Sequence, residues 1–222
     1  EIEHRGFTNG LNALIHLAGN YSDVEQLVVT GTSAGSVPTP LFAGLASDLI
    51  PDADIVTFGD SSGAYPNSEP VATWLSSVWG TAGSIPDWPE TEGLTGPNWS
   101  IPQLYVYACQ HAPDIRFGRL DYAFDPIRVS YDDLGAGDEL LLGLIEQTEE
   151  EIESAGVDLA SYVAPGPIHT VIAGEAFYTT EVDGVRMVKR QAMCHSRTAI
   201  MADDGKVLVA ECLHDGQLVL RH

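Results

Sequence analysis

The sequence predicts an α/β domain in which a mostly parallel β-sheet is flanked by helices. Three observations support this class. A short apolar, β-rich run at residues 27–29 is followed by a glycine-rich turn and then by helical spacing at residues 40–49. A second β-rich run at residues 53–58 lies at a distance from the first that suits a βαβ crossover. Further predicted helices and strands then alternate along the chain, as in α/β proteins.

The remaining elements follow from periodicity and from turn residues. Before the first strand, apolar residues on one face predict a helix within residues 11–18. After the second strand, the chain is predicted to form a helix over residues 101–111, a strand over 115–123, a long acidic helix over 138–155 and a short strand over 161–164.

Residues 64–100 form a Trp/Pro/Gly-rich insertion that contains all four tryptophans of the chain. We expect a helix followed by a long irregular loop. In parallel α/β folds such insertions usually lie over the carboxyl ends of the strands, so we expect it over the active site. The alternative is a structural loop that is held in place by aromatic anchors.

The last stretch has a different composition from the rest. Residues 185–222 carry six of the ten Lys and Arg residues and all three methionines, which separates this segment from a main domain at 1–184. Two Asp-Gly turns, at 204–205 and 215–216, accompany β-rich runs and indicate a β-hairpin.

Charge and composition restrict the possible partners. The chain has 222 residues, which suits one globular domain. It carries 10 basic and 32 acidic residues, a net charge of −22 that disfavours nucleic acid and anionic membrane surfaces. Such an acidic surface is typical of a halophilic protein that stays soluble at high salt, or alternatively of an acidic secreted bacterial enzyme.

Several classes of site are not expected. No run of about 18 apolar residues occurs, so we expect no membrane insertion. Three cysteines are too few for a disulfide framework, and no C-x-x-C or H-E-x-x-H pattern is present. We therefore expect neither a metal nor a cofactor.

The turn after the first strand carries the strongest chemical signal. Gly31-Thr32-Ser33-Ala34-Gly35 matches G-x-S-x-G between a strand and a helix, the setting of a nucleophile elbow. The tight turn places Ser33 in strained backbone and requires small residues two positions away, Gly31 and Gly35. The N–H of Ala34 is then a candidate oxyanion donor. The alternative is a glycine-rich turn without chemistry.

A serine nucleophile requires a base and a carboxylate that orients the base. His169 is the best candidate base among seven histidines because it alone lies in a Gly/Pro-rich loop after a late strand. The alternative for His169 is a surface histidine. Two acids are candidates, since Asp60 ends the second strand and Asp125 follows the third. The alternative for Asp60 is a turn-forming or N-capping residue, and for Asp125 an N-cap before Pro126.

Five segments in order carry a family resemblance. They are His4-Arg5-Gly6 with Asn9, Val29 to Ser36, Asp60-Ser61-Ser62-Gly63, Tyr122 to Arg128, and Gly166 to Ile172 with Phe177-Tyr178-Thr179. Together they resemble the pectinacetylesterase family, which also contains the Notum-type carboxylesterases. The resemblance extends over about residues 2–188.

The resemblance implies an α/β-hydrolase-like fold in which Ser33 is the nucleophile, Asp125 the acid and His169 the base. It also implies hydrolysis of carboxylic esters, and it favours a secreted or extracytoplasmic location. Family members carry a glycine-rich segment upstream of the elbow that completes the oxyanion hole, and no such motif lies between residue 1 and the elbow. The chain is therefore expected to be N-terminally incomplete relative to the family, to take its second donor from elsewhere, or to be weakly active. The absence of the family's disulfide cysteines favours a prokaryotic member.

These features predict a serine carboxylesterase that acts on small or acetyl esters. A pectin-type polysaccharide acetylesterase is a second possibility, so the expected partner is a small-molecule or glycan ester. The same residues would also suit an acyltransferase with this triad, or a non-catalytic relative that binds carbohydrate or lipid through the Trp-rich insertion. The sequence sets neither the acyl chain length nor the oligomeric state.

Overall fold

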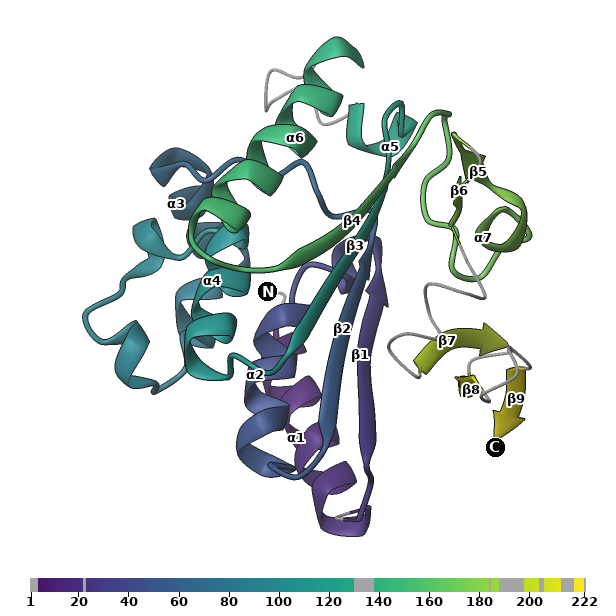
Figure 1. Ribbon diagram of the computed structural model, residues 1–222. Helices are drawn as coiled ribbons and strands as arrows, with labels where there is room; N and C mark the ends of the chain where they lie inside the picture. The colour runs from purple at the N-terminus through teal and green to yellow at the C-terminus, as the bar shows by residue number, and fades with distance from the viewer. Residues whose placement is uncertain are drawn as a thin grey trace.

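A four-stranded parallel sheet forms the centre of the molecule (Figure 1). The structure is a computed structural model that describes residues 4–21, 23–129, 138–183, 185–187, 198–203, 206–212 and 218–221. The strands follow one another across the sheet in chain order. They are β1 (Gln26–Thr32), β2 (Asp54–Asp60), β3 (Arg116–Tyr122) and β4 (Leu159–Ala164). The predicted α/β class, with a parallel sheet flanked by helices, is therefore confirmed.

The register of the strands brings their carboxyl ends to one edge of the sheet. Thr32, the last residue of β1, pairs with Asp60, the last residue of β2. Asp60 pairs in turn with Leu120 near the end of β3, and Tyr122 pairs with the last residue of β4. The loops that follow all four strands consequently meet at this edge, where ligands bind in open α/β sheets.

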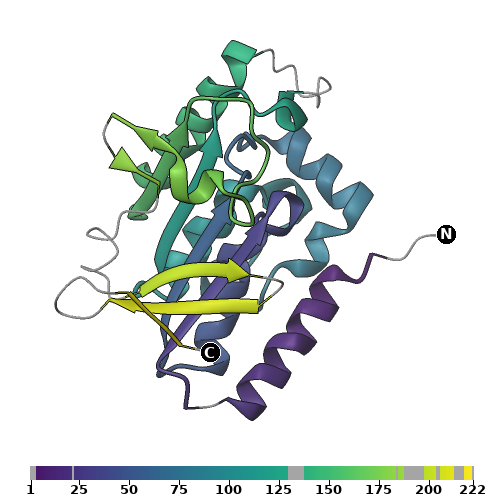
Figure 2. The same ribbon diagram turned by 90° about the vertical axis from the view of Figure 1, so that its right-hand side faces the viewer.

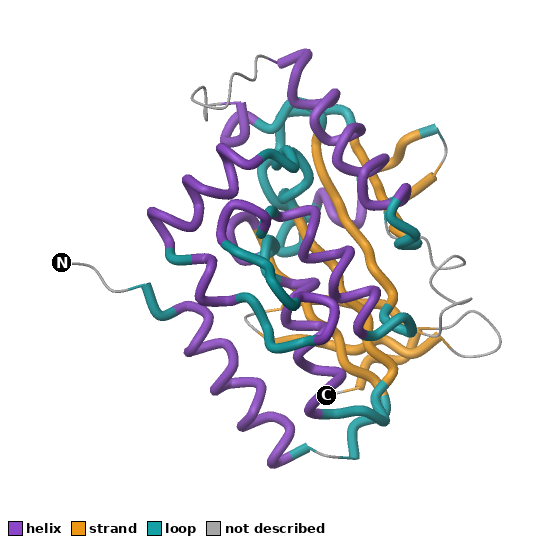
Figure 3. The backbone as a smooth tube through the Cα atoms, turned by 90° about the vertical axis from the view of Figure 1, so that its left-hand side faces the viewer, coloured by secondary structure: helices purple, strands orange, loops and turns teal. Residues whose placement is uncertain are grey.

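Three helices cover one face of this sheet (Figures 1 and 3). They are α2 (Thr39–Leu49), α4 (Ile101–His111) and α6 (Asp138–Ser154), each of which connects two neighbouring strands. Since the strands advance in one direction and parallel crossovers are right-handed, all three connections fall on the same face. Small residues of α2 and α4, Ala43, Ala46 and Ala108, let these helices pack closely on Ile55 and Phe117 of the sheet.

Further elements complete the layers. Helix α1 (Gly6–Asn20) packs on α2. The opposite face of the sheet near the carboxyl ends is covered by α7 (Ala176–Thr179) and the chain before it (Figure 2). There Val171, Ile172 and Phe177 pack on Leu120 and Tyr122 of β3. No helix among the described residues is both long and apolar enough to cross a membrane.

The Trp-rich insertion packs on the helix layer, and its second half does not lie over the strand ends where the sequence predicted it. It forms α3 (Glu69–Trp79) and three 3₁₀ turns, Thr81–Ser84, Pro89–Thr91 and Gly96–Asn98. Its second half packs on the faces of α2 and α4 that point away from the sheet, not over the strand ends. Trp88 stacks on His111 with ring centroids 4.2 Å apart and donates its indole N–H to Asp48. A Cβ at Gly44 would lie 2.4 Å from the Trp88 ring, so this glycine makes room for the tryptophan.

The C-terminal segment forms small antiparallel sheets. The predicted hairpin runs pair as β8 (Lys206–Cys212) and β9 (Leu218–Arg221), and β7 (Thr198–Asp203) adds a third strand. The two Asp-Gly turns lie outside the described residues. A further pair, β5 (Glu181–Val182) and β6 (Val185–Arg186), spans the predicted boundary at residue 184.

In the turn after β1, the backbone of Gly31 lies close to the carbonyl group of Gly35. The chain passes from β1 through a 3₁₀ turn at Ser33–Gly35 into α2. A Cβ at Gly31 would lie 2.1 Å from the carbonyl oxygen of Gly35, whereas a Cβ at Gly35 would meet nothing within 4 Å. The prediction that both glycines are sterically required is therefore correct for Gly31 and wrong for Gly35.

Substitution of Gly31 and of Gly35 by alanine should have different effects on the free energy of unfolding. Gly31→Ala is predicted to lower the free energy of unfolding by about 2–4 kcal/mol, because the backbone of the turn must move to admit the methyl group. Gly35→Ala is the matched control and should be neutral or stabilising by about 0.4–1 kcal/mol. Urea unfolding of both variants measures the difference, and equal effects would contradict the steric argument.

Candidate active site

Ser33, His169 and Asp125 form a continuous hydrogen-bonded chain at the carboxyl edge of the sheet. His169 Nε2 lies 2.8 Å from Ser33 Oγ, and His169 Nδ1 lies 2.6 Å from Asp125 Oδ2. Ser33 follows β1, Asp125 follows β3 and His169 follows β4. The imidazole in the middle of this chain is 20% exposed, and the carboxylate at its end is buried, at 2% exposed. The structure thus brings together the three residues that the sequence singled out as a triad.

Ser33 lies in left-handed backbone with φ of 53°. This conformation is costly for a residue with a side chain, by about 1–3 kcal/mol. It is held in place because the Ser33 carbonyl accepts hydrogen bonds from the N–H and the hydroxyl of Ser36, at 3.0 and 2.9 Å. The turn directs the Ser33 hydroxyl to His169. Ala34 follows in the first turn of the 3₁₀ helix, where backbone N–H groups have no intrahelical acceptor, so its N–H suits an oxyanion.

Asp125 has two functions at once. One carboxylate oxygen, Oδ1, accepts the N–H of Ile127 at 2.9 Å, at the start of the short helix α5 (Pro126–Val129). The other oxygen, Oδ2, accepts from His169. The sequence is compatible with either a helix cap or a triad acid at Asp125, and the structure shows the cap contact together with a contact to the imidazole. Fixing one oxygen on the backbone orients the other toward the imidazole.

Asp60, the second candidate acid, faces the loop of His169 and not its ring. Asp60 Oδ2 accepts the N–H groups of Val171 and Ile172 at 2.7 and 3.0 Å. The neighbouring Ser61 donates to Asp60 Oδ1 at 3.2 Å and accepts the N–H of Thr170 at 3.0 Å. Three consecutive backbone N–H groups after His169 are therefore held by the end of β2. The carboxylate that the histidine ring contacts is that of Asp125.

Burial dominates the electrostatics of Asp60. The residue is completely buried, and burial raises the pKa of its carboxyl above the ordinary 3.8. The N–H groups of Ile172 and Val171, the Ser61 hydroxyl and the nearby His169 lower the pKa, but they offset the burial only in part. Asp60 is thus a desolvated carboxylate with several donors directed at it.

Backbone strain is concentrated at this edge of the sheet. Among the described residues, four non-glycine residues have positive φ, and three of them, Ser33, Ser61 and Thr170, belong to the site. Ser61 and Thr170, with φ of 66° and 61°, are joined by a hydrogen bond. Strain of this kind persists only where the surrounding contacts fix the backbone, and it is typical of functional sites.

A buried ion network supports the loop that carries Ser61. Arg119 of β3 is 2% exposed and lies 3.0 Å from Asp121 and 3.1 Å from Glu149 of α6. Asp121 accepts the N–H of Gly63 at 2.8 Å, and Thr148 donates to the Gly63 carbonyl. Neither this network nor the anchoring role of Asp60 was predicted from the sequence. The sequence did contain one signal of this network. Two charged residues, Arg119 and Asp121, lie inside a parallel strand, where apolar residues are usual.

Comparisons with known proteins give no assignment. The chain matches no protein-family model, and no curated protein matches its sequence. Within the described ranges, no group of three or more His, Cys, Asp or Glu side chains could hold a metal ion. What the site contains is a hydroxyl, an imidazole and a carboxylate joined in series by hydrogen bonds.

The raised pKa of Asp60 predicts a pH dependence of stability. Because the folded protein binds the Asp60 proton more tightly than the unfolded chain, this contribution is complete below 3.8 and is lost as the pH rises through the higher folded pKa. Asp60→Asn has no such titration. The unfolding free energy of the wild type should therefore fall relative to that of the variant as the pH rises from about 4 toward neutrality. Urea unfolding across this range tests it, and a wild-type free energy that rises relative to that of the variant would show that the donors outweigh the burial.

Proposed function

We propose that the protein is a serine carboxylesterase in which Ser33 is the nucleophile, His169 the general base and Asp125 the orienting acid. The observation that carries the proposal is the pair of contacts at His169, 2.8 Å to Ser33 Oγ and 2.6 Å to Asp125 Oδ2. These are the distances that nucleophile activation and tautomer control require.

The mechanism follows from the direction of these hydrogen bonds. Asp125 accepts the Nδ1–H of His169, which leaves the Nε2 lone pair directed at the Ser33 hydroxyl. Ser33 Oγ attacks the ester carbonyl carbon while Nε2 takes its proton, and the N–H of Ala34 donates to the developing oxyanion. When the tetrahedral intermediate collapses, the imidazolium gives this proton to the leaving alcohol. Water, deprotonated by His169, then attacks the acyl-enzyme and releases the acid and free Ser33.

The finer fold assignment is part of the same proposal. An α/β-hydrolase-like domain is supported by the strained elbow between β1 and α2, by the acid after β3 and by the histidine after β4. The order of the three residues along the chain, Ser33, Asp125 and His169, also agrees with that arrangement. The resemblance of the five segments to the pectinacetylesterase family supports an ester as the substrate.

The charge of the chain restricts the class of ester that we propose as substrate. A net charge of −22 repels strongly anionic polymers such as de-esterified pectin at low salt. Small neutral esters, including acetyl esters, meet no such repulsion. We therefore place small neutral carboxylic esters before acidic polysaccharides as substrates.

Loss of the serine hydroxyl should abolish hydrolysis. Ser33→Ala is predicted to lower kcat for p-nitrophenyl acetate by about 10³-fold or more, because no other group replaces the nucleophile. Ser47→Ala is the matched control, since its hydroxyl only donates to the Gly44 carbonyl within α2. A fluorophosphonate probe should label the wild type and the control but not Ser33→Ala. Equal hydrolysis by wild type and Ser33→Ala would refute the proposal.

The two aspartates should differ when each is changed to asparagine. Asp125→Asn is predicted to lower kcat by about 10⁴-fold, because the amide stabilises the wrong imidazole tautomer. Asp60→Asn should stay within about tenfold, since an amide oxygen can still accept the N–H groups of Val171 and Ile172. Steady-state hydrolysis of the same ester measures both. A larger loss in Asp60→Asn than in Asp125→Asn would assign the acid to Asp60.

A further inference from the structure

Thr170, the residue after His169, has a backbone conformation that its own side chain disfavours. Its φ is 61°, in the left-handed region, where a β-branched residue is an outlier. Such a backbone persists only where neighbouring contacts hold it. Because the chain leaves His169 through this residue, the contact that holds Thr170 also helps to set the position of the imidazole.

That contact is the hydroxyl of Ser61. The Thr170 N–H donates to Ser61 Oγ at 3.0 Å, and Ser61 Oγ donates to Asp60 Oδ1 at 3.2 Å. Ser61 and Asp60 are both buried. Since the carboxylate accepts the hydroxyl proton, a lone pair of the hydroxyl oxygen is left for the Thr170 N–H. The orientation of this hydroxyl is therefore fixed from both sides.

Ser61 is strained as well, and β3 holds its backbone. Its φ is 66°, and its N–H donates to the Leu120 carbonyl at 2.8 Å. Two residues further, the Gly63 N–H donates to Asp121 Oδ1 at 2.8 Å. A Cβ at Gly63 would lie 2.2 Å from Asp121 Oδ2, so the loop lies directly against this carboxylate. Ser61 is thus part of a loop that is attached to β3 at two points.

Buried charges keep this attachment in place. Asp121 lies 3.0 Å from Arg119, and both side chains are buried. Thr148 of α6 donates to the Gly63 carbonyl, and the Thr148 hydroxyl accepts from Arg119 Nη1 at 3.3 Å. The loop is therefore fixed to α6 as well as to β3, and Ser61 is a rigid support for the chain after His169.

We propose that Ser61 is a positioning residue for His169, because its hydroxyl holds the Thr170 backbone and so directs the imidazole at Ser33 and Asp125. Ser61 acts through Thr170 and touches no reacting atom. The inference rests on the proposed function, for which the imidazole must be in this position, but the position itself can be measured without catalysis.

Two variants remove the hydroxyl and differ in stability. Glycine adopts a φ of 66° without strain and alanine does not, so Ser61→Gly should have a higher urea midpoint than Ser61→Ala. Both should lower kcat for p-nitrophenyl acetate by about 10–100-fold, because the imidazole is misplaced. KM should stay within about twofold in both. A merely structural role would instead make kcat follow stability and recover in Ser61→Gly.

Ser62→Ala is the matched control. Ser62 is the next residue and is also buried, but its hydroxyl lies beside Gly59 of β2, where an added Cβ would be 3.2 Å away. Its kcat should stay within about twofold of the wild type.

Proton NMR observes the histidine directly. A proton in a short, charge-assisted hydrogen bond resonates downfield of the amide signals, and the Nδ1–H of His169 lies in such a bond to Asp125. The signal is assigned by its absence from His169→Gln. It should be unchanged in Ser62→Ala and shifted or broadened in both Ser61 variants. If the wild type shows the signal but hydrolyses no ester, the proposed function fails, and this measurement still decides the role of Ser61.

Three results would overturn the proposal. The first is a His169 signal that is the same in the wild type and in both Ser61 variants. The second is an active wild type whose kcat is retained in Ser61→Gly or is lost equally in Ser62→Ala. The third is a wild type without the signal, since Ser61 would then have no ordered bond between His169 and Asp125 to support.

Discussion

The buried carboxylate of Asp60, with the backbone N–H groups of Val171 and Ile172 directed at it, is the contact on which the site depends. Ser33 follows β1 at one edge of the sheet, and the histidine loop follows β4 at the other. Neighbouring strands are about 4.8 Å apart, so His169 has to reach back over two strands to meet the serine. Asp60 ends β2, next to β1, and its carboxylate accepts the backbone N–H groups that hold this loop. Without the Asp60 contacts, the loop behind the 2.8 Å contact between His169 and Ser33 would keep only the Ser61 hydrogen bond and its apolar packing on β3.

The strained residues show how the site keeps its geometry. Ser33, Ser61 and Thr170 all have left-handed backbone, and each is held by a hydrogen bond. The Ser61 N–H is donated to the Leu120 carbonyl at 2.8 Å, and the Thr170 N–H to the Ser61 hydroxyl. A backbone that is fixed in this way costs stability, but it sets the positions of Ser33 and of the loop that carries His169. Preorganisation of this kind is a main source of catalytic power in acyl transfer.

Sequence patterns predicted those parts of the molecule that local chemistry dictates. The strand–turn–helix at Ser33, the strands and helices of the sheet and the loop of His169 depend on nearby residues, and they lie where expected. The role of Asp60 could not be predicted, because its donors lie more than 110 residues away. The position of Trp88 on the outer face of α2 depends on the gap left by Gly44, which only the packed structure reveals. The choice between two acids was likewise a question of tertiary contacts, and the resemblance favoured the one that His169 contacts.

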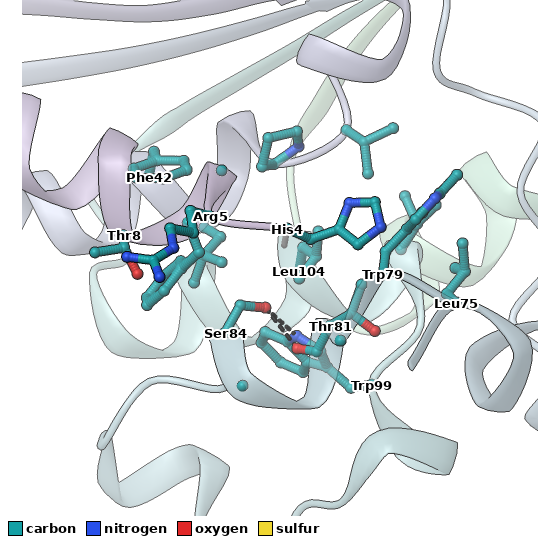
Figure 4. A pocket seen from close by; sticks show the side chains of 18 of the residues that line it. His4, Arg5, Thr8, Phe42, Leu75, Trp79, Thr81, Ser84, Trp99 and Leu104 are labelled. Carbon is teal, nitrogen blue, oxygen red and sulfur yellow. Dashed lines mark hydrogen bonds between the residues drawn. The ribbon is translucent and has the colours of Figure 1, made fainter. Parts of the chain in front are cut away.

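The stretch from Ser33 to Pro38 connects the Ser33–His169 contact with a cavity at the start of α2 (Figure 4). Its first residue carries the hydroxyl that meets His169, and Val37 and Pro38 line the cavity at the start of α2. Between them, the Ser36 side chain is fully buried and donates its hydroxyl to the Ser33 carbonyl, whereas Ala34 and Gly35 are exposed. The same short stretch therefore contributes Val37 and Pro38 to the wall of the cavity and, through Ser36, a hydrogen bond that holds the strained backbone of Ser33.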